Sequence, residues 1–227
     1  MFQSKWKKLK EVLKDQTHIN FCKVCFQKIE SSFIDLFNPR RTLCNSCFNK
    51  LNPRLKTIML DDIKGMGIYP YEDVIKELIY QYKGCYDIEL KYVFLEPYKF
   101  LLKLKYKKYI VIPIPSYVDA DKKRGFNHVK EIIKSLDFES YDCLEKIKDI
   151  KQSSLNYFQR KEKVNNFKLK EESCLKGKNV LIVDDVLTTG ETMKSCIKLL
   201  KKLKPNKISF LVISYSNRFM SKFDERK

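Results

Sequence analysis

The sequence predicts an α/β protein with a mostly parallel, doubly wound sheet and a small cysteine-rich module in its N-terminal region. Two runs of aliphatic residues, 109–114 and 180–183, are typical of strands buried on both faces of a parallel sheet. Helical patterns follow both runs, and this alternation with short loops predicts helices on both faces of that sheet. Two CxxC pairs precede the alternating region and predict a separate module.

The composition excludes several classes of protein. The 227 residues are 44% hydrophobic, which is enough for one medium domain with a core and a small additional module. No apolar run is long enough for a membrane span, and the N-terminus lacks the apolar core of a signal peptide. Eight cysteines without a secretory signal favour metal binding in a reducing cytoplasm over disulfides.

The charge of the chain is strongly positive. Lysine and arginine number 46 against 28 acidic residues, which gives a net charge of +18. Such a charge attracts polyanions, nucleic acid first, because binding releases counterions. A lysine-rich composition that simply reflects an AT-rich genome is the alternative explanation. The charge therefore favours nucleic acid as a partner without establishing it.

Residues 1–52 are predicted to form a basic helix and a zinc module. Apolar residues recur at helical spacing within 1–15, and we expect this stripe to pack on the protein itself rather than on a membrane or nucleic acid. The two CxxC pairs consist of Cys22, Cys25, Cys44 and Cys47. Four thiolates in this arrangement predict a closed tetrahedral Zn²⁺ site, and His18 is a weaker alternative ligand. The module either has a structural role or binds nucleic acid, and the neighbouring Arg40 and Arg41 favour binding of nucleic acid.

The rest of the chain is predicted to be a linker and one domain. Residues 53–68 contain Pro53, Gly65 and Gly67 and little periodicity, which predicts a linker. Domain 69–227 then begins with a helical face from Tyr71 to Tyr82. The further expected elements are a helix at 88–104 interrupted at Pro97, a strand at 109–114, a helix at 128–136, a mobile loop or hairpin at 141–166, a strand at 180–183, a helix at 191–203 and a strand at 208–213.

The strongest functional signal is VLIVDDVLTTGET, residues 180–192. Asp184 and Asp185 come where the strand is expected to end, and ligands of parallel sheets bind beyond that end. The TTG sequence at 188–190 would then open a helix whose free N–H groups attract an anion, with hydroxyls as further donors. The carboxylates would accept hydrogen bonds from ribose hydroxyls or hold Mg²⁺ through water. We therefore expect a sugar-phosphate site, and ordinary helix capping is the alternative.

Several segments together resemble one known family. The 180–192 stretch resembles the phosphoribosyl pyrophosphate motif of type I phosphoribosyltransferases, which implies a fold of that kind. The CxxC pairs, QYKG, IPIPS, RGFNH, QSSLNYFQRKEKVNNF and VLIVDDVLTTGET occur in this order over about residues 20–215 and resemble the ComF family of bacterial competence proteins, in particular its ComFC branch. The resemblance implies a cytoplasmic protein, or one at the inner face of the membrane, that carries incoming single-stranded DNA in natural transformation. It also implies the competence helicase ComFA and the recombination loader as partners.

The resemblance implies roles for individual residues. Zinc would be bound by the four cysteines, and Asp184, Asp185 and Arg160 would be catalytic in an active transferase. The expected ligand-binding residues are Asp184, Asp185, Val186, Leu187, Thr188, Thr189, Gly190, Glu191 and Thr192, with Ser116 near pyrophosphate and Arg124 near phosphate. Gln152, Arg160 and Asn165 would lie in the catalytic-loop region. Two residues depart from the family pattern: His128 replaces a usual Gln, and Glu191, in a first helical turn that tolerates an acid, replaces a small residue.

Two functions of different classes are compatible with these patterns. One is a DNA-handling factor whose pocket binds phosphoribosyl pyrophosphate or a related sugar phosphate. The other is an active phosphoribosyltransferase that moves ribose 5-phosphate to a base or amine with Mg²⁺. No acceptor-binding segment is evident, and this together with the charge favours DNA handling. Tyrosines among lysines would stack on bases or else fill the core; these are Tyr80, Tyr82, Tyr86, Tyr106 and Tyr109.

Overall fold

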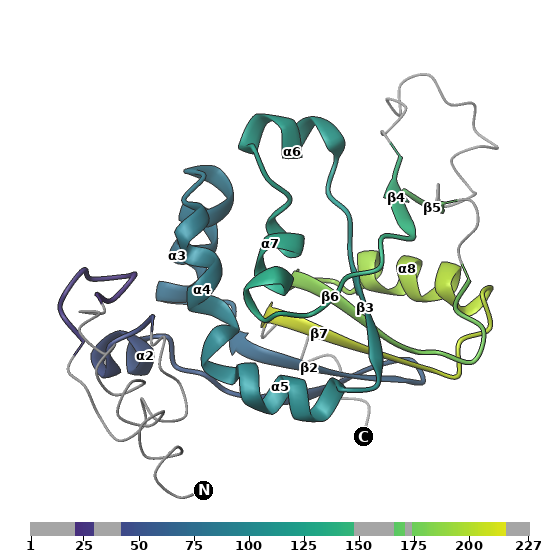
Figure 1. The fold of residues 1–227 in the computed structure, drawn as a ribbon, viewed down its shortest axis with the longest axis horizontal. Helices are drawn as coiled ribbons and strands as arrows, with labels where there is room; N and C mark the ends of the chain where they lie inside the picture. Colours follow the sequence, from purple (N-terminus) through teal and green to yellow (C-terminus); the bar gives the residue numbers. More distant parts are fainter. Residues whose placement is uncertain (1–20, 30–41, 148–165, 171–173, 217–227) are drawn as a thin grey trace, which may run out of the picture. The chain divides into compact units, whose positions relative to one another are not determined.

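The computed structural model describes residues 21–29, 42–147, 166–170 and 174–216 (Figure 1). The chain divides into two compact units, residues 1–50 and residues 51–227. Several expectations fall outside the described residues: the helix at 1–15, His18, Arg40, Arg41, Gln152, Arg160 and Asn165. Among the described residues, no helix is both long enough and apolar enough to cross a membrane.

The second unit is built on a five-stranded sheet in the order β1-β2-β7-β6-β3. Its strands are β1 (Lys56–Leu60), β2 (Ile63–Pro70), β3 (Tyr109–Pro113), β6 (Asn179–Leu187) and β7 (Lys207–Tyr215). β1 pairs with β2 as an antiparallel hairpin, and the pairs β2·β7, β7·β6 and β6·β3 are parallel. The mostly parallel sheet that the sequence predicts is therefore confirmed.

Helices lie on both faces of the sheet, as Figure 1 shows for α5 and α8. The helices of this unit are α3 (Asp73–Gly84), α4 (Lys91–Phe94), α5 (Lys99–Tyr106), α6 (Val118–Arg124), α7 (His128–Ser135) and α8 (Glu191–Lys201), with short 3-10 turns η2 (Ile88–Leu90) and η3 (Glu96–Tyr98). Met193 and Leu200 of α8 pack in one core with Ile182 and Phe210. Lys105 of α5 contacts Met66, which is the register partner of Leu211. Leu211 and Phe210 are neighbours in β7 and point to opposite faces, so α5 covers the face opposite to the one covered by α8. The sheet is thus doubly wound.

A small hairpin adds to the core on the α8 side. Its strands β4 (Leu144–Lys146) and β5 (Phe167–Leu169) are antiparallel, and Leu144 and Phe167 are buried in the same cluster as Met193. β4 lies within the loop or hairpin predicted at 141–166, whereas β5 begins one residue after that range, and most of the range lies outside the described residues. Two further elements differ from expectation: α6 forms within the basic stretch before Gly125, and β6 continues through the two aspartates to Leu187.

The linker expected at 53–68 is wrong, because β1 and most of β2 lie there. Gly65 and Gly67 suggested a loop, but each leaves room for an aromatic ring of the neighbouring strand. A Cβ added at Gly65 would lie 2.3 Å from the Phe210 ring, and one added at Gly67 would lie 2.4 Å from the Tyr215 ring. These glycines mark the close approach of side chains from β7 rather than a break in the strand.

Replacing Gly65 by Ala should destabilise the protein by about 1–3 kcal/mol, because the methyl group would displace the fully buried Phe210 ring. The measurement is urea unfolding followed by circular dichroism. Gly84→Ala is the matched control, because its methyl group would meet the ring of Tyr80, which is 62% exposed and free to shift, and because Ala favours the helix. Equal stability of the two variants would contradict the close-packed role of Gly65.

Candidate functional site

The four cysteines of the first unit converge on one point. The Sγ atoms of Cys22, Cys25, Cys44 and Cys47 all lie within 4.8 Å of one another. The Sγ atoms of Cys25 and Cys44 are 3.7 Å apart, close to the roughly 3.8 Å expected between two thiolates on one tetrahedral Zn²⁺. The backbone N–H of Lys23 donates to the carbonyl of Thr42 at 2.8 Å and so joins the two knuckles. The donor set and its spacing fit a zinc ion.

In the second unit, β3 and β6 bring the predicted ligand-binding segments together. Pro113 is the register partner of Val183, and the N–H of Ile114 donates to the carbonyl of Val183 at 2.9 Å. Because the two strands are parallel, their carboxyl ends meet at the same edge of the sheet. The loop with Ser116 therefore begins beside the Asp184–Asp185 pair, as the sequence predicts for a ligand site.

The two aspartates of β6 have different surroundings. Asp184 is partly buried, and burial together with the adjacent Asp185 carboxylate raises its pKa well above the usual range. Burial alone would also raise the pKa of Asp185, which is 7% exposed, but His128 and the Lys83 charge hold that pKa below its usual range. Asp185 is therefore the more readily ionised member of the pair, and Asp184 more readily holds a proton.

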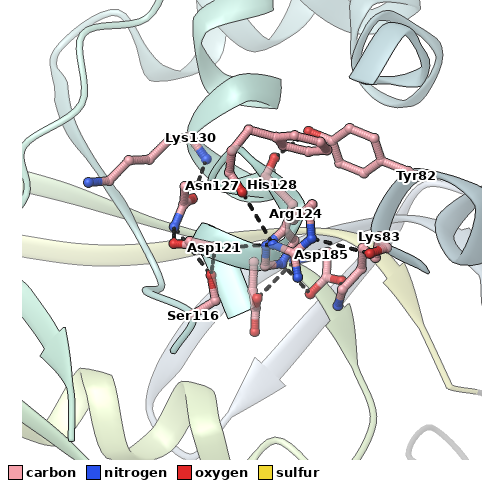
Figure 2. Close-up of polar contacts among 11 residues, drawn as sticks. Tyr82, Lys83, Ser116, Asp121, Arg124, Asn127, His128, Lys130 and Asp185 are labelled. Atoms are coloured by element: carbon pink, nitrogen blue, oxygen red, sulfur yellow. Dashed lines mark hydrogen bonds and ion pairs between the residues drawn. The ribbon is translucent and has the colours of Figure 1, made fainter. Parts of the chain in front are cut away.

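Asp185 lies between side chains from two helices (Figure 2). Lys83, from the last turn of α3, forms an ion pair with Asp185 Oδ2. His128, the first residue of α7, places its Nε2 3.7 Å from Asp185 Oδ1. Each carboxylate oxygen thus faces a different donor, and the ion pair with Lys83 joins α3 to β6.

Arg124 is held inside the same group of side chains. Its Nη1 lies 3.1 Å from Asp121 Oδ1 and 3.2 Å from His128 Nδ1, and its Nε donates to the carbonyl of Lys83 at 3.2 Å. Only 9% of the side chain is exposed. Contact between Arg124 and a phosphate stays a prediction, and Nε and Nη1 already contact these partners.

Ser116 is fixed to the start of α7. Its Oγ donates to Asp121 Oδ1 and accepts from Asn127 Nδ2 at 3.3 Å. Asn127 Nδ2 also donates to Asp121 Oδ2 at 2.7 Å, while Asn127 Oδ1 caps α7 by accepting from the N–H of Lys130 at 2.9 Å. The RGFN sequence thus orders the loop after β3 through side-chain hydrogen bonds.

The turn between β6 and α8 presents hydroxyl groups to solvent. Thr188, Thr189 and Thr192 are exposed, and Gly190 has a left-handed backbone with φ 80° at the N-cap of α8. Glu191 is also exposed in the first helical turn. Of the other two residues expected here, Val186 is half-buried, whereas Leu187 is buried in the core, so its side chain cannot contact a ligand without repacking.

Sequence reasoning assigned no role to Lys83 or Asp121. Lys83 is the third residue of the QYKG segment, and only the fold brings it to Asp185, 102 residues later. Asp121 lies in a stretch rich in lysine that gave no sign of its carboxylate turning inward. The available signals were the unexplained QYKG segment and an acid three residues before Arg124, where helical spacing allows an ion pair.

The tyrosines considered for base stacking separate into two groups. Tyr82 and Tyr106 are buried in the core, and Tyr109 is half-buried. Tyr80 is 62% exposed and Tyr86 is 40% exposed, at and just beyond the last turns of α3. Of the five tyrosines, only these two are exposed, and both lie close in sequence to Lys83.

Comparison with known proteins identifies the family. Residues 120–219 match the phosphoribosyl transferase domain. Competence protein ComFC of Streptococcus pneumoniae is 32% identical to this chain, and the alignment covers 70% of this chain and 74% of that protein. Competence protein ComFC of Bacillus subtilis is 29% identical, and the alignment covers 63% of this chain and 60% of that protein. Among solved structures, adenine phosphoribosyltransferase of Saccharomyces cerevisiae aligns at 15% identity over 78% of this chain and 93% of its own, with a TM-score of 0.42. The chain belongs to the ComFC family of competence proteins, with a phosphoribosyltransferase-like domain joined to an N-terminal four-cysteine module.

Proposed function

We propose that this protein handles incoming single-stranded DNA during natural transformation and that the edge formed by β3 and β6 binds phosphoribosyl pyrophosphate or a related sugar phosphate. The observation that carries the proposal is the 32% identity to competence protein ComFC over most of both chains. The net charge of +18 supports a polyanionic partner. The competence helicase ComFA and the recombination loader are the protein partners we propose, in the cytoplasm or at the inner face of the membrane.

The geometry at the β6 edge supports a sugar-phosphate ligand. Asp184 and Asp185 offer acceptors for vicinal ribose hydroxyls, and Mg²⁺ bound with the ligand would offset their charge. The exposed hydroxyls of Thr188, Thr189 and Thr192 surround the N-terminus of α8, an eleven-residue helix whose free N–H groups favour a phosphate. Ser116 lies on the neighbouring loop, where it would approach the pyrophosphate.

Transfer of ribose 5-phosphate is the second candidate function. The match of residues 120–219 to the phosphoribosyl transferase domain favours it. Catalysis would require the bound Mg²⁺ to stabilise the pyrophosphate leaving group, and a segment to exclude water. Arg160, which we expected to take part, lies outside the described residues. We rank DNA handling above ribose 5-phosphate transfer because the alignment with ComFC covers far more of the chain than the domain match does.

Zinc is the metal we propose for the four-cysteine cluster. Purified protein should contain about one zinc per chain by elemental analysis. Cys47→Ser should lose most of that zinc and unfold the first unit, because the ion supplies much of the folding free energy of such a module. Cys85→Ser, at an exposed cysteine outside the cluster, is the matched control and should keep its zinc. A folded wild-type protein without metal would contradict the assignment.

Asp184→Asn should weaken binding of phosphoribosyl pyrophosphate with Mg²⁺ by at least about tenfold, because hydrogen bonds to a charged group contribute about 1.5–3 kcal/mol. Folding stability should not fall, because the raised pKa of Asp184 indicates that a charge is unfavourable at this position, and the amide is uncharged. Isothermal calorimetry and thermal unfolding measure the two effects. Asp62→Asn, on the exposed turn after β1, is the control and should bind normally. Unchanged affinity in Asp184→Asn would remove this residue from the site.

Fluorescence anisotropy of a labelled single-stranded oligonucleotide tests the DNA proposal. Binding should weaken at least tenfold between about 50 and 200 mM salt, because phosphate contacts release counterions. Combined replacement of Tyr80 and Tyr86 by Ala should lower affinity by about tenfold or more, since each stacked base contributes about 1–3 kcal/mol. Phe100→Ala, at an 81% exposed ring on α5, is the matched control.

Absence of binding at low salt would overturn the DNA proposal and place the transferase first. Normal binding by the double tyrosine variant would move the contact surface away from α3. A change in DNA affinity on adding phosphoribosyl pyrophosphate would show that the two sites are coupled.

A further inference from the structure

Three side chains form a continuous chain of contacts from α6 through α7 to β6. Arg124 Nη1 lies 3.2 Å from His128 Nδ1, and His128 Nε2 lies 3.7 Å from Asp185 Oδ1 (Figure 2). We propose that His128 is a positioning residue, which couples Arg124 to Asp185 and so orients the carboxylate that receives the ligand. This inference rests on the proposed function, because it concerns the same sugar-phosphate site.

The contact with Arg124 determines the tautomer of His128. A guanidinium group has only donors, so His128 Nδ1 must accept the hydrogen bond from Arg124. The ring is then neutral and carries its proton on Nε2. This proton faces Asp185 Oδ1, where it stabilises the ionised carboxylate. Without Arg124, only the Asp185 carboxylate 3.7 Å from Nε2 would favour this tautomer, and the proton could more easily move to Nδ1, which would leave Asp185 facing a lone pair.

The two carboxylate oxygens of Asp185 contact different side chains. His128 faces Oδ1, and Lys83 forms an ion pair with Oδ2. Because each oxygen has its own partner, rotation of the carboxylate about its Cβ–Cγ bond would disturb both contacts. The remaining lone pairs are then directed to fixed positions, which is what recognition of two adjacent hydroxyls requires.

The contacts of the His128 ring are buried, and further hydrogen bonds hold the residues that make them. His128 is 5% exposed, so water has little access to replace either ring contact. Tyr82 donates from its hydroxyl to the carbonyl of His128 at 2.7 Å, which fixes the first residue of α7. Arg124 is held in turn by Asp121 and by the carbonyl of Lys83. Within the described ranges, Arg124 and Asp185 are the charged groups in contact with His128, and Lys83 is linked to it through Asp185.

Binding by His128 variants tests the positioning role. Gln has one amide acceptor and one amide donor, so His128→Gln can accept from Arg124 and donate to Asp185. Leu has neither group. In calorimetry with phosphoribosyl pyrophosphate and Mg²⁺, His128→Gln should stay within about threefold of wild type, whereas His128→Leu should weaken binding about ten- to hundredfold, as loss of an orienting partner does. Equal binding by the Leu variant, or equal loss in both variants, would overturn the inference.

A spectroscopic measurement tests the tautomer without any ligand. The chain contains two histidines, so protein labelled with ¹⁵N-histidine gives two imidazole signals, and His128→Gln identifies which one is His128. At neutral pH, His128 should be protonated on Nε2 alone, and Arg124→Met should weaken that preference, because only Asp185 then favours it. A proton on Nδ1, or a charged ring, in wild-type protein would overturn the inference.

The two experiments separate this inference from the proposed function. If the wild-type protein does not bind phosphoribosyl pyrophosphate, the ligand proposal fails, and the positioning role in ligand binding fails with it. If the wild-type protein binds and His128→Leu binds equally well, only the role of His128 fails.

Discussion

The burial of Asp185 is the constraint on which the arrangement around the site depends. A carboxylate taken out of water must be paired and hydrogen-bonded, or it becomes protonated. Here the compensation comes from Lys83 and His128, which belong to different helices. The position of α3 and α7 relative to β6 is therefore tied to the charge state of one side chain, and Arg124 extends this dependence to α6.

The same group of residues explains how the loop after β3 is ordered. The carboxylate of Asp121 in α6 accepts hydrogen bonds from Ser116, Arg124 and Asn127. These donors come from the loop after β3, from α6 itself and from the N-cap of α7. Asn127 in turn caps α7 and places His128 at its first position. Hydrogen bonds among the residues from Ser116 to His128 thus hold this segment together. The loop that we expect near pyrophosphate therefore needs no ligand to be held in place.

Most of the fold was predictable because its signals are local. The aliphatic runs of β3 and β6, the helical pattern of α8 and the CxxC pairs can each be recognised within a short stretch. Gly65 and Gly67 were misinterpreted because the rings that fill their space come from β7, about 145 residues away. Lys83 was missed for the same reason, since its partner Asp185 lies 102 residues later. Pairing between distant residues leaves no pattern in either local sequence.

The order of strands has a consequence for synthesis of the chain. β7, the last of the described strands, lies between β2 and β6 and pairs with both. β2 therefore has only its hairpin partner β1 until residues 207–215 have left the ribosome, and its parallel pairing then closes a loop of well over a hundred residues. During translation, the edges of β2 and β6 that pair with β7 must wait for that strand. Folding of the second unit is consequently expected to be completed only after β7 has been synthesised, whereas the cysteine module, whose four ligands all precede β1, can bind its metal much earlier.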